Sequence, residues 1–297
     1  YHGKQLGTGE DIWRHAQGVA LIAASLKLDV ETRLAALLFA LPDYLELSAE
    51  KLAERFGAQV APQLAQLVDG LRRLNGLRLV AGANDRATAD LKAQTEVLRK
   101  MLLAMSEDVR VVLLRLASRT QTLRFYADHP GAERDATACE SLDLYAPLAN
   151  RLGIWQLKWE LEDLSFRYIE PQTYKKIATM LDERRLERSR FIADAIARLQ
   201  TEIAAAGIEA EVFGRPKHIY SIYNKMRGKN LEFSEVYDVR ALRVLVHDER
   251  DCYMVLGMVH RLWQPISGEF DDYIAHPKDN YYRSLHTSVM AEDGRAL

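Results

Sequence analysis

The chain has 297 residues, 48% of them hydrophobic and 28% charged, which is long enough for two domains that each bury a core. The formal net charge is −2, so the overall charge does not indicate a nucleic-acid site, and no apolar run approaches the length of a membrane span. Only Cys139 and Cys252 are present, far apart in the sequence, which argues against a disulfide framework and makes a reducing cytosol the expected compartment. Tyr1 stands in place of an initiator Met and no signal peptide follows, so we expect a piece of a longer protein.

Residues 11–206 have a mainly helical pattern. Val19, Ile22 and Ala23 fall at helical spacing, and Pro171 is expected to start a long helix that Gly207 ends. After Gly207 short apolar runs alternate with helical segments, which predicts an α/β unit and a domain boundary close to this glycine. The expected elements are a strand over 208–213, a helix over 217–227, a strand over 239–247, a helix over 251–263 and a strand over 285–290.

A basic segment opens the first of these helices. Lys217, Ser221 and Lys225 are spaced by four and would share one helix face, with Pro216 in the first turn. Two cations beside a hydroxyl near a helix N-terminus suit a polyphosphate, and Arg215 could stack on a base or clamp a phosphate. The alternative is a solvated basic face, and the spacing alone does not decide between the two.

Two charged residues accompany the strand expected over 239–247. Asp238 at its start is either a cap or turn residue or, next to a polyphosphate, a Mg²⁺ ligand. Arg243 in its middle needs a partner, either a structural carboxylate, which we favour, or a substrate.

A polar loop follows over 277–287, with adjacent tyrosines at Tyr281 and Tyr282. Such a loop could stack on a base and grip phosphates. Alternatively, it is a surface loop whose tyrosines cover the edge of the core, and His286 alone is weak support for either interpretation.

These segments together resemble the RelA/SpoT family of guanosine tetra- and pentaphosphate synthetases, and the resemblance covers nearly the whole chain. The matching segments are Gly214–Ile222 with Lys225, Tyr237–Arg240, Asp272–Ala275 with Pro277-Lys278, Ser284–Thr287, Leu98–Met105 and Tyr145–Gly153. The resemblance implies an all-helical HD-like domain, here a pseudo-hydrolase, followed by a nucleotidyltransferase-like domain with a mixed sheet flanked by helices.

The family transfers pyrophosphate from ATP to the 3′-hydroxyl of GDP or GTP and releases AMP. The resemblance implies that Arg215 stacks on adenine, that Asp238 binds Mg²⁺, and that Tyr282 stacks on guanine. It also assigns the ATP phosphates to Lys217, Ser221 and Lys225, and the acceptor side to Lys278, Asn280 and His286. Among these, Asp238, Lys225 and Arg215 are the expected catalytic residues, and positioning with charge neutralisation is the chemistry that such a transfer needs.

The acidic segment 269–272 resembles the synthesis-only branch, in which GDP is often the preferred acceptor, although a solvated acidic turn would look the same. Two features depart from the family pattern. Tyr281 and Arg283 stand where Gly and Gln are usual, and a Glu expected beyond Leu297 is not included. A chain without this Glu could bind nucleotides and synthesise poorly.

The first half resembles the family's HD-type hydrolase domain, which uses Mn²⁺, but most metal ligands are replaced. His15 matches the first ligand, while Phe39-Ala40 replaces the His-Asp pair. Asp43-Tyr44 replaces a Glu-Asp pair, and Ser118 and Thr122 replace a later Asp and Asn. We therefore predict a structural or regulatory half with no hydrolase metal, in which His15 is an ordinary helix residue.

The sequence thus predicts a degenerate hydrolase domain over 1–168, a linking helical region over 169–206 and a synthetase domain over 207–297. The expected partners are ATP, GDP or GTP and Mg²⁺, with no membrane, no direct nucleic-acid site, and a ribosome contact only through regulatory domains not included here. The alternative function is a nucleotide-binding regulatory module without turnover.

Overall fold

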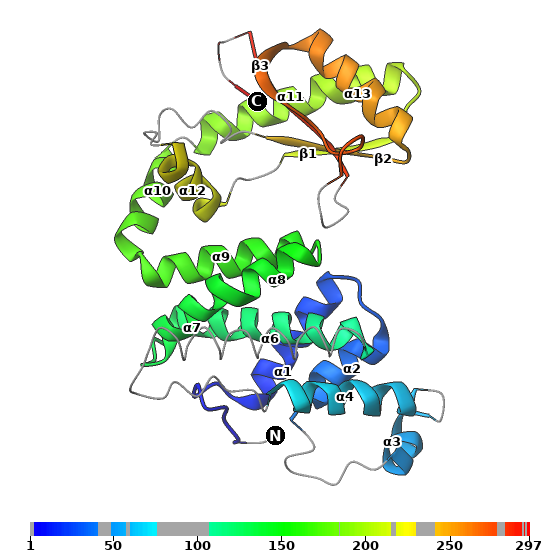
Figure 1. The fold of residues 1–297 in the computed structure, drawn as a ribbon, viewed down its shortest axis with the longest axis vertical. Helices are drawn as coiled ribbons and strands as arrows, with labels where there is room; N and C mark the ends of the chain where they lie inside the picture. The colour runs from blue at the N-terminus through cyan, green and yellow to red at the C-terminus, as the bar shows by residue number, and fades with distance from the viewer. Residues whose placement is uncertain are drawn as a thin grey trace. The chain divides into compact units, whose positions relative to one another are not determined.

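The computed structural model describes residues 3–40, 49–57, 60–75, 107–183, 185–214, 218–229, 241–277, 283–292, 294 and 296–297 (Figure 1). Their contacts divide the chain into two units. Unit 1 comprises Tyr1–Asn150 with Ile154–Ile169, and unit 2 comprises Arg151–Gly153 with Glu170–Leu297. The helices expected within 169–206 thus belong to unit 2, and the three-part division predicted from the sequence stays a prediction.

The described residues of unit 1 form helices and the segments that join them, with one isolated β-bridge between Gln5 and Asp11. Its elements are α1 (Ile12–Ser25), α2 (Val30–Leu38), α3 (Ala49–Phe56), α4 (Ala61–Asn75), α6 (Val109–Asp128), α7 (Arg134–Glu140), a π-helical turn (Ser141–Tyr145), α8 (Ala146–Arg151) and α9 (Trp155–Ile169). Helix α6 packs against α1, α4 and α9, and it buries Leu114, Leu116 and Leu123 completely. This apolar stripe on a central helix makes α6 the core element of the unit.

Aspartates begin three of these helices. The side chains of Asp11, Asp29 and Asp108 accept hydrogen bonds from backbone N–H groups in the first turns of α1, α2 and α6. Arg110 bridges two of the caps, with Nη1 3.1 Å from Asp29 Oδ2 and Nη2 2.7 Å from Asp108 Oδ2. The hydrogen bonds from Arg110 lower the pKa of Asp108. At Asp29, burial would raise the pKa, but hydrogen bonds from Thr32 and Arg110 outweigh it and lower the pKa.

Unit 2 alternates helices and strands as the sequence predicts. Its elements are α10 (Pro171–Glu183), α11 (Arg185–Ala205), β1 (Ala210–Gly214), α12 (Ile219–Lys229), β2 (Leu242–Val246), α13 (Glu249–Leu262), β3 (Gln264–Asp272) and β4 (Leu285–Met290). Gly207 follows α11 with a φ of +68°, which confirms that it ends the helix. The single long helix expected from Pro171 is described as α10 and α11, on either side of residue 184. Strand β3 was not predicted.

The fold class, a helical domain followed by a small domain of helices and sheet, is confirmed. Within the described residues the strands form two antiparallel ladders, β1–β2 and β3–β4, rather than the one mixed sheet that the resemblance implies. The register of β3 shifts between Pro265 and Phe270, and Gly268 within this irregular stretch has a φ of +80°. Such a bulge re-aims the residues that follow it, here the acidic segment 269–272.

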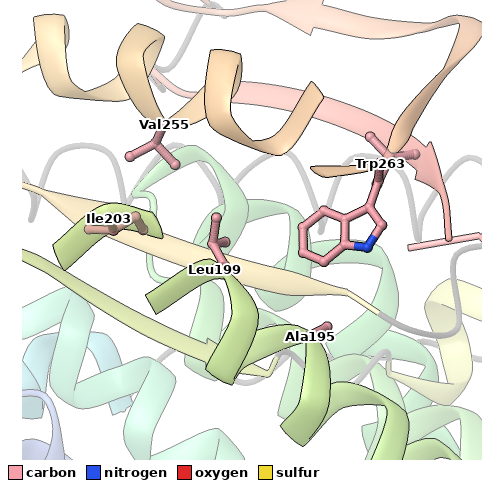
Figure 2. Packing of buried hydrophobic residues seen from close by; sticks show 6 residues of the cluster. Ala195, Leu199, Ile203, Val255 and Trp263 are labelled. Carbon is pink, nitrogen blue, oxygen red and sulfur yellow. The ribbon is translucent and has the colours of Figure 1, made fainter. Parts of the chain in front are cut away.

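The core of unit 2 lies between α11, α13 and the strands (Figure 2). Leu199 and Ile203 of α11 are opposite Val255 of α13, and Trp263 closes one end of the cluster. The guanidinium carbon of Arg198 lies 5.9 Å from the centre of the Trp263 ring. This core holds α13 in place over the strands, so α13 can serve as a support for the site.

Candidate functional site

A cavity of about 530 Å³ in unit 2 is the candidate site. Its apolar wall comes from the core, including Leu199, Val255 and Trp263. Its polar wall comes from α12, β2, β3 and β4, and comprises His218, Ser221, Arg243, Glu269, Asp271, Ser284, His286, Thr287 and Ser288. An apolar cavity with converging polar groups is typical of a small-molecule site.

Helix α12 contributes the predicted phosphate-binding hydroxyl. Ser221 lies in the first turn, where helix N–H groups and the helix dipole favour an anion, and Lys225 follows one turn later on the same face. The helix begins at Ile219, and its first bond runs from Ile222 N–H to the carbonyl of His218 at 3.1 Å. Lys217 lies outside the described residues, so the expectation that it shares this helix face stays a prediction.

Strand β4 brings the predicted acceptor-side residue His286 to the same cavity. His286 is paired in register with Asp271 of β3, and its ring meets the Tyr273 ring edge-on at 5.3 Å. The structure therefore places one predicted ATP-side residue, Ser221, and one predicted acceptor-side residue, His286, on the walls of one cavity.

The acidic segment is the end of strand β3 and not a turn, although Glu269, Phe270 and Asp271 are exposed as the alternative of a solvated acidic turn expects. Glu269 and Asp271 line the cavity, whereas the intervening Phe270 contacts the His260 ring of α13 and Asp272 bonds to Tyr253 of α13. Alternation along a strand explains this split, since neighbouring side chains point to opposite faces. The sequence resemblance singled out the segment but not this division.

The other predicted site residues lie outside the residues that the structure describes. They are Arg215, Lys217, Asp238, Lys278, Asn280 and Tyr282, and the departure at Tyr281 lies there too. Arg243 is half-buried and lines the cavity, so both interpretations of this arginine stay open. Arg283, the second departure, forms a short ion pair with Glu249 of α13.

In unit 1 the position of the replaced metal ligands holds a buried polar network. His15, 1% exposed, contacts Glu10 Oε2 through Nδ1 at 2.6 Å and Ser118 Oγ through Nε2 at 2.8 Å. Gln121 Nε2 donates to Glu10 Oε1 at 2.7 Å, and the Phe39 ring lies 5.6 Å from the His15 ring. His15 is therefore in a helix as predicted, but it is a network residue rather than an ordinary one. The sequence analysis missed Glu10 and Gln121.

These residues do not fit a divalent metal. Both ring nitrogens of His15 already have hydrogen-bond partners, and Ser118 supplies a hydroxyl where the family's pattern has a carboxylate. Phe39 packs its ring near His15, and Ala40 is 4% exposed in the core. Within the described residues, no group of three His, Cys, Asp or Glu side chains is arranged to hold a metal ion. Asp43 and Tyr44 lie outside those residues, and Thr122 on α6 is half-buried.

The two units match two known protein regions. Residues 1–155 match the HD domain, and residues 214–297 match the region found in RelA and SpoT proteins. A GTP pyrophosphokinase of Escherichia coli K12 is 45% identical over 287 residues, which cover 96% of this chain and 38% of the relative. GTP pyrophosphokinases of Myxococcus xanthus and Streptomyces coelicolor are 40% and 39% identical, and the chain covers 37% and 33% of their lengths.

The fold and these matches define a two-domain protein in which an HD-type helical domain precedes a domain of the type found in RelA and SpoT proteins. The chain belongs to the RelA/SpoT family. It spans less than two fifths of the length of these relatives. In the described parts of the chain, no helix has the length and apolar character needed to cross a bilayer.

Proposed function

We propose that the protein transfers pyrophosphate from ATP to the 3′-hydroxyl of GDP or GTP. The observation that carries this proposal is the single cavity shared by Ser221 and His286, which the family pattern assigns to the donor and to the acceptor. Relatives named GTP pyrophosphokinase, at 39–45% identity, support the same reaction. The acceptor oxygen attacks the β-phosphorus of ATP, the bond to the α,β-bridging oxygen breaks, and AMP leaves.

Each predicted residue then has a role in positioning or charge neutralisation. Ser221 and Lys225 of α12 would hold the ATP phosphates, with help from Lys217, while Arg215 stacks on adenine. Tyr282 would stack on guanine, and Lys278, Asn280 and His286 would line the acceptor side. Transfer of this type depends on electrostatic stabilisation more than on covalent catalysis.

Mg²⁺ is the proposed cofactor, held by Asp238 together with substrate oxygens. Magnesium prefers oxygen ligands, and the carboxylates of Glu269 and Asp271 on the cavity wall are of this kind. When bound, the ion neutralises charge on the polyphosphate. The cytoplasm is the proposed location, and any ribosome contact would be made by other parts of the protein.

The test is incubation of the full-length protein with ATP, GDP and Mg²⁺, followed by measurement of AMP and the pyrophosphorylated acceptor. Asp238→Asn should abolish turnover and leave nucleotide binding largely intact. Arg227→Ala, which changes an exposed cation on the same helix as Lys225, is the control and should behave as wild type. Nucleotide binding without AMP release in the wild type would favour the alternative, a regulatory nucleotide-binding module.

A further inference from the structure

The acidic segment ends in a residue with different surroundings from its neighbours. Asp272 is half-buried at the end of β3, and its Oδ1 accepts hydrogen bonds from the N–H groups of Ile274 at 3.0 Å and Ala275 at 2.8 Å. These bonds close the turn that leads from β3 into the polar loop, and they lower the pKa of Asp272. Asp272 therefore acts on the backbone, whereas Glu269 and Asp271 line the cavity.

Helix α13 holds the second carboxylate oxygen of Asp272. The hydroxyl of Tyr253 donates to Asp272 Oδ2 at 3.0 Å. Glu249, one turn earlier on the same helix face, pairs with Arg283. Arg283 directly precedes Ser284, whose carbonyl accepts the N–H of Tyr273 at 2.9 Å.

The two ends of the polar loop are thus attached to each other and to one helix. Tyr253 holds the end at Asp272, and Glu249 holds the end at Arg283. Further along the same helix, His260 Nε2 lies 2.9 Å from Thr287 Oγ1 on β4. Since the core of unit 2 fixes α13, this helix is a rigid reference for the loop ends.

We propose that Asp272, held by Tyr253 on α13, is a positioning residue that fixes the turn over Ile274 and Ala275, and so sets the affinity for the guanine nucleotide acceptor. This inference rests on the acceptor role that the proposed function gives to the residues that follow this turn in the sequence. It also gives Arg283 a role, because an arginine at this place supplies the second attachment, to Glu249. Asp272 acts through the geometry of the turn and not through its charge on the substrate.

Steady-state kinetics of the full-length protein distinguish these two modes of action. Asp272→Ala removes the acceptor for both N–H groups and should raise the KM for GDP about tenfold, while the KM for ATP stays within about twofold. Asp272→Asn keeps an oxygen acceptor for the same two N–H groups and should restore most of the GDP affinity. A residue acting through its negative charge would not be rescued by Asn, so an Asn variant as weak as the Ala variant would overturn the proposal.

Tyr253→Phe removes only the hydroxyl and should raise the KM for GDP about threefold, since Tyr253 and Asp272 are partly exposed and a single bond is lost. The matched control is Tyr168→Phe in unit 1, which removes a hydroxyl bonded to the Leu123 carbonyl at 2.6 Å and should leave the KM for GDP unchanged. An equal change in the KM for GDP in Tyr253→Phe and in Tyr168→Phe, or equal changes in the KM for ATP and for GDP in Tyr253→Phe, would contradict a role specific to the acceptor.

Amide hydrogen exchange gives a reading that does not depend on turnover. The N–H groups of Ile274 and Ala275 should exchange at least about tenfold faster in Asp272→Ala than in the wild type, and Asp272→Asn should restore their protection. If Asp272→Asn restores the protection but the wild-type protein transfers no pyrophosphate, the proposed function has failed while the anchoring contact stands. Unchanged exchange in Asp272→Ala would refute the anchoring contact itself.

Discussion

Replacing His15 by alanine tests whether the buried network is a structural element of unit 1. The imidazole makes two contacts, to Glu10 at 2.6 Å and to Ser118 at 2.8 Å, and it is 1% exposed. Without it, the Glu10 carboxylate loses its contact with His15 and keeps the bond from Gln121, and the hydroxyl of Ser118 loses its contact with the imidazole. Removing one member of a buried, hydrogen-bonded pair costs about 3–5 kcal/mol, a large part of a total stability of about 5–15 kcal/mol.

The assay is chemical unfolding followed by tryptophan fluorescence, since Trp13, Trp155 and Trp159 report on unit 1. Arg14→Ala, an exposed change on the same helix, is the control and should alter the free energy of unfolding by less than about 0.5 kcal/mol. A double-mutant cycle with Glu10→Ala should give a coupling energy of about 1–3 kcal/mol. A coupling below about 0.5 kcal/mol, or a loss in His15→Ala no larger than in Arg14→Ala, would refute the reasoning.

Three further predictions follow from particular contacts. A Cβ at Gly18 would collide with the side-chain amide of Gln121 and displace it from Glu10. Gly18→Ala should therefore lower the free energy of unfolding, measured by urea titration, by about 1 kcal/mol, because the gain in helix propensity offsets part of the lost hydrogen bond. Arg110→Gln should lower stability by about 1 kcal/mol at neutral pH, a value discounted because Asp29 is 43% exposed. The folded-state pKa values of Asp29 and Asp108 are lowered, so their contribution is fully present above the unfolded value of 3.8 and is lost as the pH falls through the folded-state values. Urea titrations over a pH series should therefore find the difference between Arg110→Gln and wild type falling once the pH drops below 3.8. Lys225→Ala should raise the KM for ATP about tenfold and leave the KM for GDP unchanged in steady-state assays, and equal effects on both substrates would contradict its place on the donor side.

The sequence predicts the elements of unit 2 well where local patterns determine them. The strand expected over 239–247 is found as β2, and the helix expected over 251–263 is found as α13 with Asp248 as its N-cap. Strand β3 was missed because Pro265, Gly268 and the acidic residues have low strand propensity. It forms through pairing with β4, a contact between segments about which local propensity carries no information.

The network in unit 1 shows a second limit of sequence reasoning. His15 contacts a residue 103 positions away, and Glu10 contacts one 111 positions away, so no local spacing could reveal these pairs. His15 was singled out only because the family has a ligand at this place. The useful signal was the loss of the other ligands, which indicated that His15 needed a new partner without saying which one.

The division of the acidic segment between two faces can be predicted from the sequence only once the segment is known to form strand β3. As a turn, the four residues would share one solvated environment. As a strand, they alternate, so Glu269 and Asp271 face the cavity while Asp272 faces α13. The assignment of distinct roles to neighbouring carboxylates therefore depends on tertiary structure rather than on composition.

Restoring the His-Asp pair is the sharpest test of what has replaced the hydrolase site. Phe39→His with Ala40→Asp returns two ligand types, but we expect no Mn²⁺-dependent release of pyrophosphate from ppGpp and no Mn²⁺ binding by calorimetry. Both nitrogens of His15 are engaged, Ser118 still lacks a carboxylate, and an aspartate at the 4% exposed position of Ala40 would be buried without a designated partner. Adding Ser118→Asp to this double variant should bring a Mn²⁺-dependent rise in Tm only if His15 exchanges Glu10 or the aspartate introduced at position 118 for the metal, at the expense of the network that now stabilises α1 against α6. Hydrolysis of ppGpp by the double variant without Ser118→Asp would contradict this expectation. It would show that a metal displaces the hydrogen-bond partners of His15 and that His15 retains the role of a metal ligand.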